Sequence, residues 1–457
     1  MGVMPVNPLL VSMSLPIVIS MLVQALYNVV DSHFVSYISE DALVAVGLAF
    51  PAQNLMISVA VGTGVGINAL LSKSLGEKKF DLVNRTAMNG VFLAFCSWIL
   101  FAVLGSLFSH TFMDMQTTVS AIADYGTQYL LIVSVASVGL MFQVCFERLL
   151  QSTGKTIYTM VSQGTGAILN IIFDPLLIFG VGPFPQLGIA GAAWATVLGQ
   201  VAGSLLGLYL NLRVNHEITF SLRGFRPSGM VIRKIYSVGV PSIIMMSIGS
   251  VMTFGVNKIL GAFSSTAVAV FSAYFKLMSF VFMPVFGLNN GIVPIIAYNY
   301  GARRPDRMEQ AIRLGILYAA SIMAMGMVLF WLIPDRLLGI FNASPYMLEL
   351  GVPALRIISL TFLPAAFGIV TSSVCQALGH GVLSLIVSLV RQLVAILPAA
   401  WILGHFWGLG AVWYAFPFAE IFAFILSIFF MIYVRRSVIR PLHGPGEDGY
   451  LSLPDQV

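Results

Sequence analysis

Long apolar runs constrain the fold of this chain more than any other feature. A helix needs about 20 mostly apolar residues to cross the hydrocarbon core of a bilayer. The 457-residue chain contains twelve such runs: residues 9–37, 42–72, 85–109, 121–150, 154–180, 188–212, 232–262, 265–299, 308–334, 346–376, 380–405 and 408–434. Only 9% of its residues are charged, whereas a soluble globular chain carries roughly 25%. The expected fold class is an all-α membrane protein with twelve transmembrane helices.

Basic residues occupy every second loop between these runs. The basic loops and the end of the last run contain Lys73, Lys78, Lys79, Arg85, Lys155, Arg213, Arg223, Arg226, Arg233, Lys234, Arg303, Arg304, Arg307, Arg313, Arg435, Arg436 and Arg440. In the opposite loops only Arg336, beside Asp335, breaks the alternation. By the positive-inside rule, both termini are expected in the cytoplasm. Because the basic residues are dispersed in short loops, they do not indicate nucleic-acid binding.

An internal repeat relates the two halves of the chain. A shift of 225 residues aligns Pro16 with Pro241 and five glycines with glycines, and a shift of 219 aligns GAAW (191–194) with GAVW (410–413). Since each half holds six runs, both halves start on the same side, as in secondary transporters built from parallel repeats. The predicted domains are two pseudo-symmetric six-helix lobes, 1–212 and 232–436, with a cytoplasmic linker at 213–231 and a cytoplasmic tail at 437–457.

A few acidic residues interrupt the apolar runs. An acid at the centre of a spanning helix costs about 2.5–3.5 kcal/mol on insertion scales, so it is a candidate functional residue. At about 1.5 Å per residue, Asp31 lies roughly 12 Å and Asp174 roughly 10 Å to the outer side of the bilayer midplane. Thr196 falls level with Asn170, which shares a helix face with Asp174 at i and i+4. The four side chains are expected to lie close together in the first lobe.

This set has the chemistry of a cation site. Pro175 has no N–H for the carbonyl of Ile171, so a backbone oxygen is added beside the carboxylate of Asp174. Oxygen ligands suit a hard cation such as Na⁺. Two acids in one apolar pocket should not both ionise freely, so the same pair could instead accept a proton. A purely structural interpretation is that the acids pair with polar groups of the lobe, and that Thr196 bonds its own helix backbone.

Other residues are candidates for the substrate pathway or for motion. Tyr27 and Asn28 lie about one turn before Asp31 and either line the same pocket or bridge helices. In the second lobe, the basic residues either pair with Glu420 or helix-end carbonyls, or act in gating or substrate exclusion; they are Lys276, Arg356 and Arg391. Glu147 and Arg148, near a cytoplasmic end, form either a latch or a packed pair. Pro16 is a candidate hinge in the first helix, and Pro175 in the fifth.

Several motifs together resemble the MATE (multidrug and toxic compound extrusion) family of transporters. They are LPIVISMLVQALYNVVD (15–31), SLGEKK (74–79) with its counterpart NYGARR (299–304), ERLLQSTGKT (147–156) and LGIAGAAWATVLGQ (187–200). The resemblance covers residues 10 to 435. It implies a two-lobed, V-shaped antiporter that exports amphipathic organic cations in exchange for inward H⁺ or Na⁺.

The resemblance also implies which residues couple transport to the ion, and where the protein lies in the cell. It carries over Asp31, Asn170, Asp174 and Thr196 as the coupling site and tentative Na⁺ ligands. The stretches GVPSIIMMSIGSVMTFGVNK (239–258) and SSVCQALG (372–379) have no acid, whereas some sodium-driven members carry acids in these two segments, which favours the first lobe for the coupling chemistry. We expect a monomer in the plasma membrane, the inner membrane of a bacterium, with small organic cations and the bilayer as partners. No cofactor and no enzymatic activity are expected.

Two other functions remain open from the residues alone. A lipid or lipid-linked glycan flippase of a related two-lobe fold would need a basic cavity, for which Lys276, Arg356 and Arg391 are candidates. A receptor or an intramembrane enzyme belongs to a different class of protein. The sequence has no metal-ligand cluster, no nucleophile–base pair and no phosphate loop to support an enzyme.

Overall fold

The computed structural model describes residues 1–221, 225–341 and 343–443, with the side chains of Asn28, Val29, Ser32, Ser36, Glu40 and His443 left outside the description. All regular structure in these ranges is helical. Ten helices are long and apolar enough to cross a membrane, and two further spans each consist of two helices joined at a bend. The predicted fold class, an all-α membrane protein with twelve transmembrane segments, is confirmed.

The first bundle contains seven helices. Serine caps the second of them, because the Ser39 hydroxyl accepts a hydrogen bond from the backbone N–H of Ala42 at 3.0 Å. Such a cap satisfies one of the free N–H groups at a helix start. The helices are α1 (Val6–Ser36), α2 (Glu40–Gly76), α3 (Phe80–Gln116), α4 (Ser120–Val135), α5 (Val138–Ser152), α6 (Thr156–Phe179) and α7 (Ile189–Val214).

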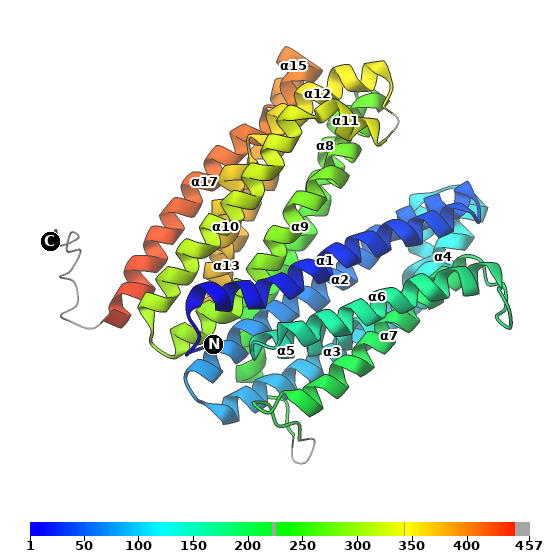
Figure 1. Cartoon of the computed structure of the whole chain (residues 1–457). Helices are drawn as coiled ribbons and strands as arrows, with labels where there is room; N and C mark the ends of the chain where they lie inside the picture. Colours follow the sequence, from blue (N-terminus) through cyan, green and yellow to red (C-terminus); the bar gives the residue numbers. More distant parts are fainter. Residues whose placement is uncertain (222–224, 342, 444–457) are drawn as a thin grey trace.

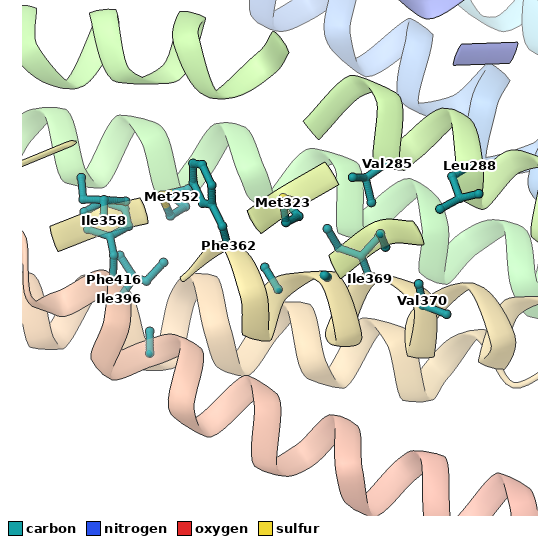
Figure 2. Packing of buried hydrophobic residues seen from close by; sticks show 14 of the residues in the cluster. Met252, Val285, Leu288, Met323, Ile358, Phe362, Ile369, Val370, Ile396 and Phe416 are labelled. Carbon is teal, nitrogen blue, oxygen red and sulfur yellow. The ribbon is translucent and has the colours of Figure 1, made fainter. Parts of the chain in front are cut away.

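The second bundle repeats this order with more breaks. Its core is built from apolar side chains such as Met252, Phe362 and Phe416, which interdigitate between the helices (Figure 2). The elements are α8 (Gly229–Gly261), α9 (Ser265–Gly301), α10 (Pro305–Leu332), α11 (Pro334–Gly339), α12 (Pro345–Ser359), α13 (Phe362–Ala377), α14 (Gly381–Leu389), the π-helix η1 (Val390–Ile396), α15 (Leu397–Trp407), α16 (Leu409–Val412), α17 (Ala415–Val434), the π-helix η2 (Arg435–Ile439) and the short 3₁₀ helix η3 (Arg440–His443).

Two runs expected as single helices are broken. Residues 121–150 form α4 and α5, bent by 46°, and residues 346–376 form α12 and α13, bent by 47°. A break frees backbone groups that need new partners in an apolar environment. At the first break, the Trp98 indole donates to the carbonyl of Val135 at 2.9 Å. At the second, the Trp331 indole donates to the hydroxyl of Ser359 at 3.1 Å. Indoles therefore hydrogen-bond at both bends.

The first helix of each bundle begins inside the other bundle. Val6 and Leu10 of α1 are buried in the apolar core of the second bundle, and Val231 and Ile235 of α8 are buried in that of the first. These pairs correspond in the 225-residue repeat. This reciprocal burial of apolar helix starts holds the two bundles together at this end.

The two bundles diverge from one end of the molecule (Figure 1). They converge where α1 begins and α17 ends, and they separate toward the end that carries α4, α11, α12 and α15 (Figure 1). At the convergent end glycines allow backbones to touch: a Cβ on Gly66 of α2 would lie 2.1 Å from the carbonyl oxygen of Ile235 in α8. Gly291 of α9 packs on Ser14 of α1 in the same way. Small residues at such crossings permit close helix packing in membranes.

Candidate functional site

A polar cluster joins α6 and α7 inside the first bundle. The Asn170 amide nitrogen donates to Asp174 Oδ2 at 3.2 Å, in the amide orientation that satisfies both of its ends. Its oxygen accepts from the backbone N–H of Thr196 at 3.0 Å and faces the Thr196 hydroxyl at 3.3 Å. All three residues are buried, with Asp174 0% exposed. Three of the four predicted coupling residues are thus in direct contact.

The hydroxyl of Thr196 also has a partner on its own helix. It donates to the carbonyl oxygen of Ala192 at 3.1 Å. This is the local backbone bond that a structural role would predict. The same hydroxyl also lies 3.3 Å from the Asn170 amide oxygen, which can accept its proton instead, so both interpretations of Thr196 describe part of its environment.

Asp31 approaches this cluster from α1. Its carboxylate interacts electrostatically with that of Asp174, and Tyr27 lies within electrostatic range of both acids. The Oδ1 atoms of Asp31 and Asp174 are both buried without a hydrogen-bond partner. The backbone of Asn28 belongs to α1, but its side chain lies outside the described residues. Two buried carboxylate oxygens without donors are a costly arrangement unless a cation or a proton occupies the site.

Two further residues of the cluster were missed by the sequence analysis. Tyr129 of α4 is 2% exposed and lies within electrostatic range of Asp31, Tyr27 and Asp174. Its hydroxyl is within hydrogen-bonding reach of Gln53 in α2. The only signal in the sequence was a polar ring in an apolar run, which is common at membrane interfaces and points to no particular partner.

The donor set is made of hard oxygen ligands. Among the described residues, no three His, Cys, Asp or Glu side chains gather as a metal site. The cluster instead offers two carboxylates, an amide and a hydroxyl, which suit Na⁺ or a proton better than a transition metal. Pro175 lies inside α6 next to Asp174 and cannot donate to the carbonyl of Ile171.

The proline of α1 has a comparable effect nearer the convergent end. Pro16 lies inside the continuous helix α1 and leaves the Ser12 carbonyl without its usual helical donor. That carbonyl accepts a hydrogen bond from the Thr156 hydroxyl of α6 at 3.4 Å. The bend-prone point of α1 is therefore tied to the helix that carries Asp174.

The basic residues of the second bundle do not form one group. Arg391, in the π-helix η1, lies 3.7 Å from Glu420 of α17, so the expected ion pair is present. Lys276 of α9 lies over the ring of Phe341, 5.8 Å from its centroid. Arg356 is exposed in the last turn of α12. Within the described ranges, no contact joins these three cations into a basic cavity.

Arg148 links the two bundles at the convergent end. Its guanidinium donates to Asn290 of α9 at 2.8 Å and to Gln151 at 2.9 Å, and it is 7% exposed. Glu147 accepts instead from Gln143 at 3.0 Å. The two neighbours are thus not a salt bridge with each other; one of them reaches across to the other bundle.

Comparison with known families and relatives agrees with this architecture. A family model described as MatE matches residues 16–176 and again residues 241–402. The two matches begin at Pro16 and Pro241, the first pair of the internal repeat.

Relatives of known name span nearly the whole chain. Multidrug export protein MepA of Staphylococcus haemolyticus is 24% identical over 424 residues, which are 93% of this chain and 92% of the relative. An FAD transporter of Shewanella oneidensis is 26% identical over 430 residues, covering 91% and 92%.

Solved structures match the whole fold. One is described as the outward-facing conformation of a multidrug resistance MATE family transporter of the MOP superfamily; it is 26% identical, with a TM-score of 0.88, over 95% of this chain and 96% of that one. Another, a MOP superfamily transporter from Pyrococcus furiosus whose binding pocket is described as having reverse polarity, is 26% identical with a TM-score of 0.85, over 96% of each chain.

Proposed function

This chain belongs to the MatE family of membrane transporters, which are not enzymes, and on that premise we propose that it exports amphipathic organic cations by antiport against H⁺ or Na⁺. The observation that carries the proposal is the pair of partnerless carboxylate oxygens on Asp31 and Asp174. Two buried carboxylate oxygens without donors are stabilised by a cation beside them. Asn170 orients Asp174 through its amide nitrogen, and the Thr196 hydroxyl lies 3.3 Å from the Asn170 oxygen.

The proposed cycle follows from charge and from the two bundles. The bundles converge at the end where α1 begins (Figure 1). The positive-inside rule predicts this end in the cytoplasm, which supports an outward-facing arrangement. H⁺ or Na⁺ from outside enters the Asp31–Asp174 cluster and lowers its net negative charge. The organic cation then binds less tightly and leaves outward. Each ligand shifts the balance between the two states only by its difference in affinity for them.

The first helix supports a route from the ion to the bundles. Asp31 and Pro16 lie on the same helix, and the first residues of α1 are buried in the second bundle. A change at Asp31 that bends α1 at Pro16 therefore acts directly on the contact between the bundles. The tie from Thr156 to Ser12 connects the same point to α6.

Export from everted membrane vesicles tests the proposal. We expect ethidium-type cations to accumulate under an imposed H⁺ or Na⁺ gradient and the accumulation to collapse when the gradient is dissipated. Asp174→Asn should abolish gradient-driven accumulation. Asp114→Asn is the matched control, because Asp114 is an exposed acid paired with His110 at 2.7 Å. Full gradient-driven export by Asp174→Asn would show that the coupling site is wrong.

A second cargo has a specific observation in its favour. The FAD transporter is as similar to this chain as the multidrug exporter is, and FAD is anionic. Separate vesicles should be offered ethidium and FAD under the same gradients. Transport of FAD without transport of ethidium would replace organic cations by flavin nucleotides as the cargo. The flippase alternative has less support, since Arg391 is held by Glu420.

A further inference from the structure

Two cavities lie at equivalent places in the two halves of the repeat. One, of about 680 Å³, is bordered by α3, α5 and α7; the other, of about 720 Å³, is bordered by α10, α13 and α17. Both volumes fall within the usual range of ligand sites, roughly 300–1,000 Å³. We call the second one the basic cavity, after its lining residues Glu309, Arg313, Ile316, Phe367, Met431 and Arg435.

The repeat register shows that the two cavities share positions but differ in charge. The 225-residue shift places Val91 on Ile316 and Phe142 on Phe367, which line the first and the basic cavity respectively. The same shift places Met88 of the first cavity on Arg313 of the basic cavity. The apolar walls are thus common to both, whereas a cation replaces methionine in the second.

The two arginines stand at the level of lipid headgroups. Arg313 lies eight residues after the start of α10, about 12 Å along a helix of roughly 42 Å. A hydrocarbon core of about 30 Å leaves roughly 6 Å of this helix outside at each end. The Arg313 backbone therefore lies a few ångströms inside the core edge, and its side chain extends outward. Arg435 follows directly after the last residue of α17, on the same side of the membrane.

The positive charge of the basic cavity is only weakly compensated. Arg435 Nε lies 3.8 Å from Glu309 Oε1, and both side chains are about half exposed, at 50% and 44%. Exposed pairs of this kind contribute about 0–1 kcal/mol. Two guanidinium groups face one carboxylate, so the rim carries net positive charge. Beneath it, Ile316, Phe367 and Met431 form an apolar floor.

We propose that the basic cavity binds an anionic phospholipid of the cytoplasmic leaflet. Its phosphate lies between Arg313 and Arg435, and an acyl chain runs along the apolar floor. Basic pockets between helices on the cytoplasmic side are the usual places for such headgroups. The cavity bordered by α3, α5 and α7 accepts acyl chains without headgroup preference. This proposal rests on the proposed function only for the membrane orientation, with both termini in the cytoplasm. It does not depend on the cargo or on the coupling ion.

Binding of defined lipids to the purified full chain tests this site. Native mass spectrometry in detergent should be titrated with phosphatidylglycerol and with phosphatidylcholine of the same acyl chains. We expect tighter binding of phosphatidylglycerol, and a roughly 30-fold loss of that binding in the Arg313→Ala/Arg435→Ala variant, from about 1 kcal/mol per arginine. Arg436→Ala is the matched control, because Arg436 is the next residue along and does not line the cavity. It should change the affinity less than twofold.

Two variants should strengthen binding and so exclude misfolding as an explanation. Glu309→Gln removes the competing carboxylate and should tighten phosphatidylglycerol binding severalfold. Met88→Arg places the missing cation in the first cavity and should raise the number of tightly bound phosphatidylglycerol molecules from one to two. Equal binding of the two lipids, or an unchanged affinity in both the double alanine variant and Glu309→Gln, would overturn the proposal.

A competition arm separates lipid from free anion. Inorganic phosphate at millimolar concentration should not displace phosphatidylglycerol, because it cannot use the apolar floor. Displacement by phosphate alone would identify a soluble-anion site and refute the lipid. Since no arm depends on transport, failure here leaves the antiporter proposal intact, and failure of the antiporter proposal leaves the lipid site intact.

Discussion

A single methyl group on Gly66 should change the balance between the two arrangements of the bundles. In the structure that Cβ would lie 2.1 Å from the carbonyl oxygen of Ile235, where ordinary contact begins at 3.4 Å. The shortfall is about 1.3 Å, and the obstacle is backbone, which cannot rotate away. Overpacking of this kind costs roughly 1–3 kcal/mol. The cost applies only where α2 and α8 touch, so it destabilises the arrangement closed at the terminal end.

That energy corresponds to a shift of roughly 5- to 150-fold between the two states. The control is Gly47→Ala on the same helix, because a Cβ there meets nothing within 4 Å. Replacing a helical glycine by alanine in open space should stabilise the helix by about 0.5–1 kcal/mol without moving the bundles. The two substitutions are chemically identical and differ only in their surroundings.

Distance measurements between spin labels on the two bundles report the shift. Labels at Arg85 and Arg436, both exposed near the terminal end, should show a longer distance population in Gly66→Ala than in wild type. The native cysteines would first be replaced; they are Cys96, Cys145 and Cys375. Gly47→Ala should reproduce the wild-type distribution. Identical distributions in all three proteins would refute the idea that this backbone contact holds the closed end together.

Three smaller perturbations test other parts of the account. Tyr129→Phe removes the hydroxyl beside Gln53 and should weaken the apparent affinity for the coupling ion about three- to tenfold, measured by Na⁺ and pH titration of transport; an unchanged titration would remove Tyr129 from the site. Asn290→Ala takes an acceptor from buried Arg148 and should cost about 1–3 kcal/mol at the closed end, seen as faster amide exchange there; exchange equal to wild type would contradict the link. Pro16→Ala restores a helical donor and should uncouple export from the gradient while drug binding is retained; intact coupling would eliminate the hinge.

The sequence predicted the number of spans because that follows from bilayer thickness alone. Runs of about 20 apolar residues have one stable form in lipid, and the structure has the corresponding helices. The bends at residues 136–137 and 360–361 were not predictable in this way. At the second break, Pro364 in the first turn of α13 has no N–H for the carbonyl of Leu360. No proline follows within a turn of the first break, and the carbonyl that Trp98 accommodates becomes visible only when α3 and α4 are placed together.

Contacts within one helix, or between residues at the same depth in the bilayer, were predictable from the sequence. Contacts between helices distant in the sequence were not. Asn170 and Asp174 share a face by their spacing, and the depth count brought Thr196 to the same level; the structure joins the three by hydrogen bonds. Tyr129 reaches the acids only because α4 packs beside α2. Arg148 was expected beside Glu147, yet it donates to a residue 142 positions away.

The burial of the first residues of α1 and α8 in the opposite bundle was also not predictable from the sequence. Leu10 and Ile235 correspond in the repeat, and each is fully buried in the core of the opposite bundle. Hydrophobicity indicates that such residues are buried but not in which bundle. The alignment of Gly66 with Gly291 indicated a backbone constraint in both halves; which helix each glycine faces required the packing.

The central claim is that H⁺ or Na⁺ in the Asp31–Asp174 cluster weakens the binding of the organic cation. Thermodynamic linkage between the binding of ion and cargo tests this claim most directly. The dissociation constant of an ethidium-type cation should be measured on the purified protein across Na⁺ concentrations and across pH, and the ion's own affinity measured with and without cargo. Because coupling free energies are reciprocal, the ion should weaken cargo binding by the same factor by which cargo weakens ion binding. The account predicts that this factor falls to one in Asp31→Asn and Asp174→Asn but not in Asp114→Asn. An undiminished factor in both cluster variants would contradict it.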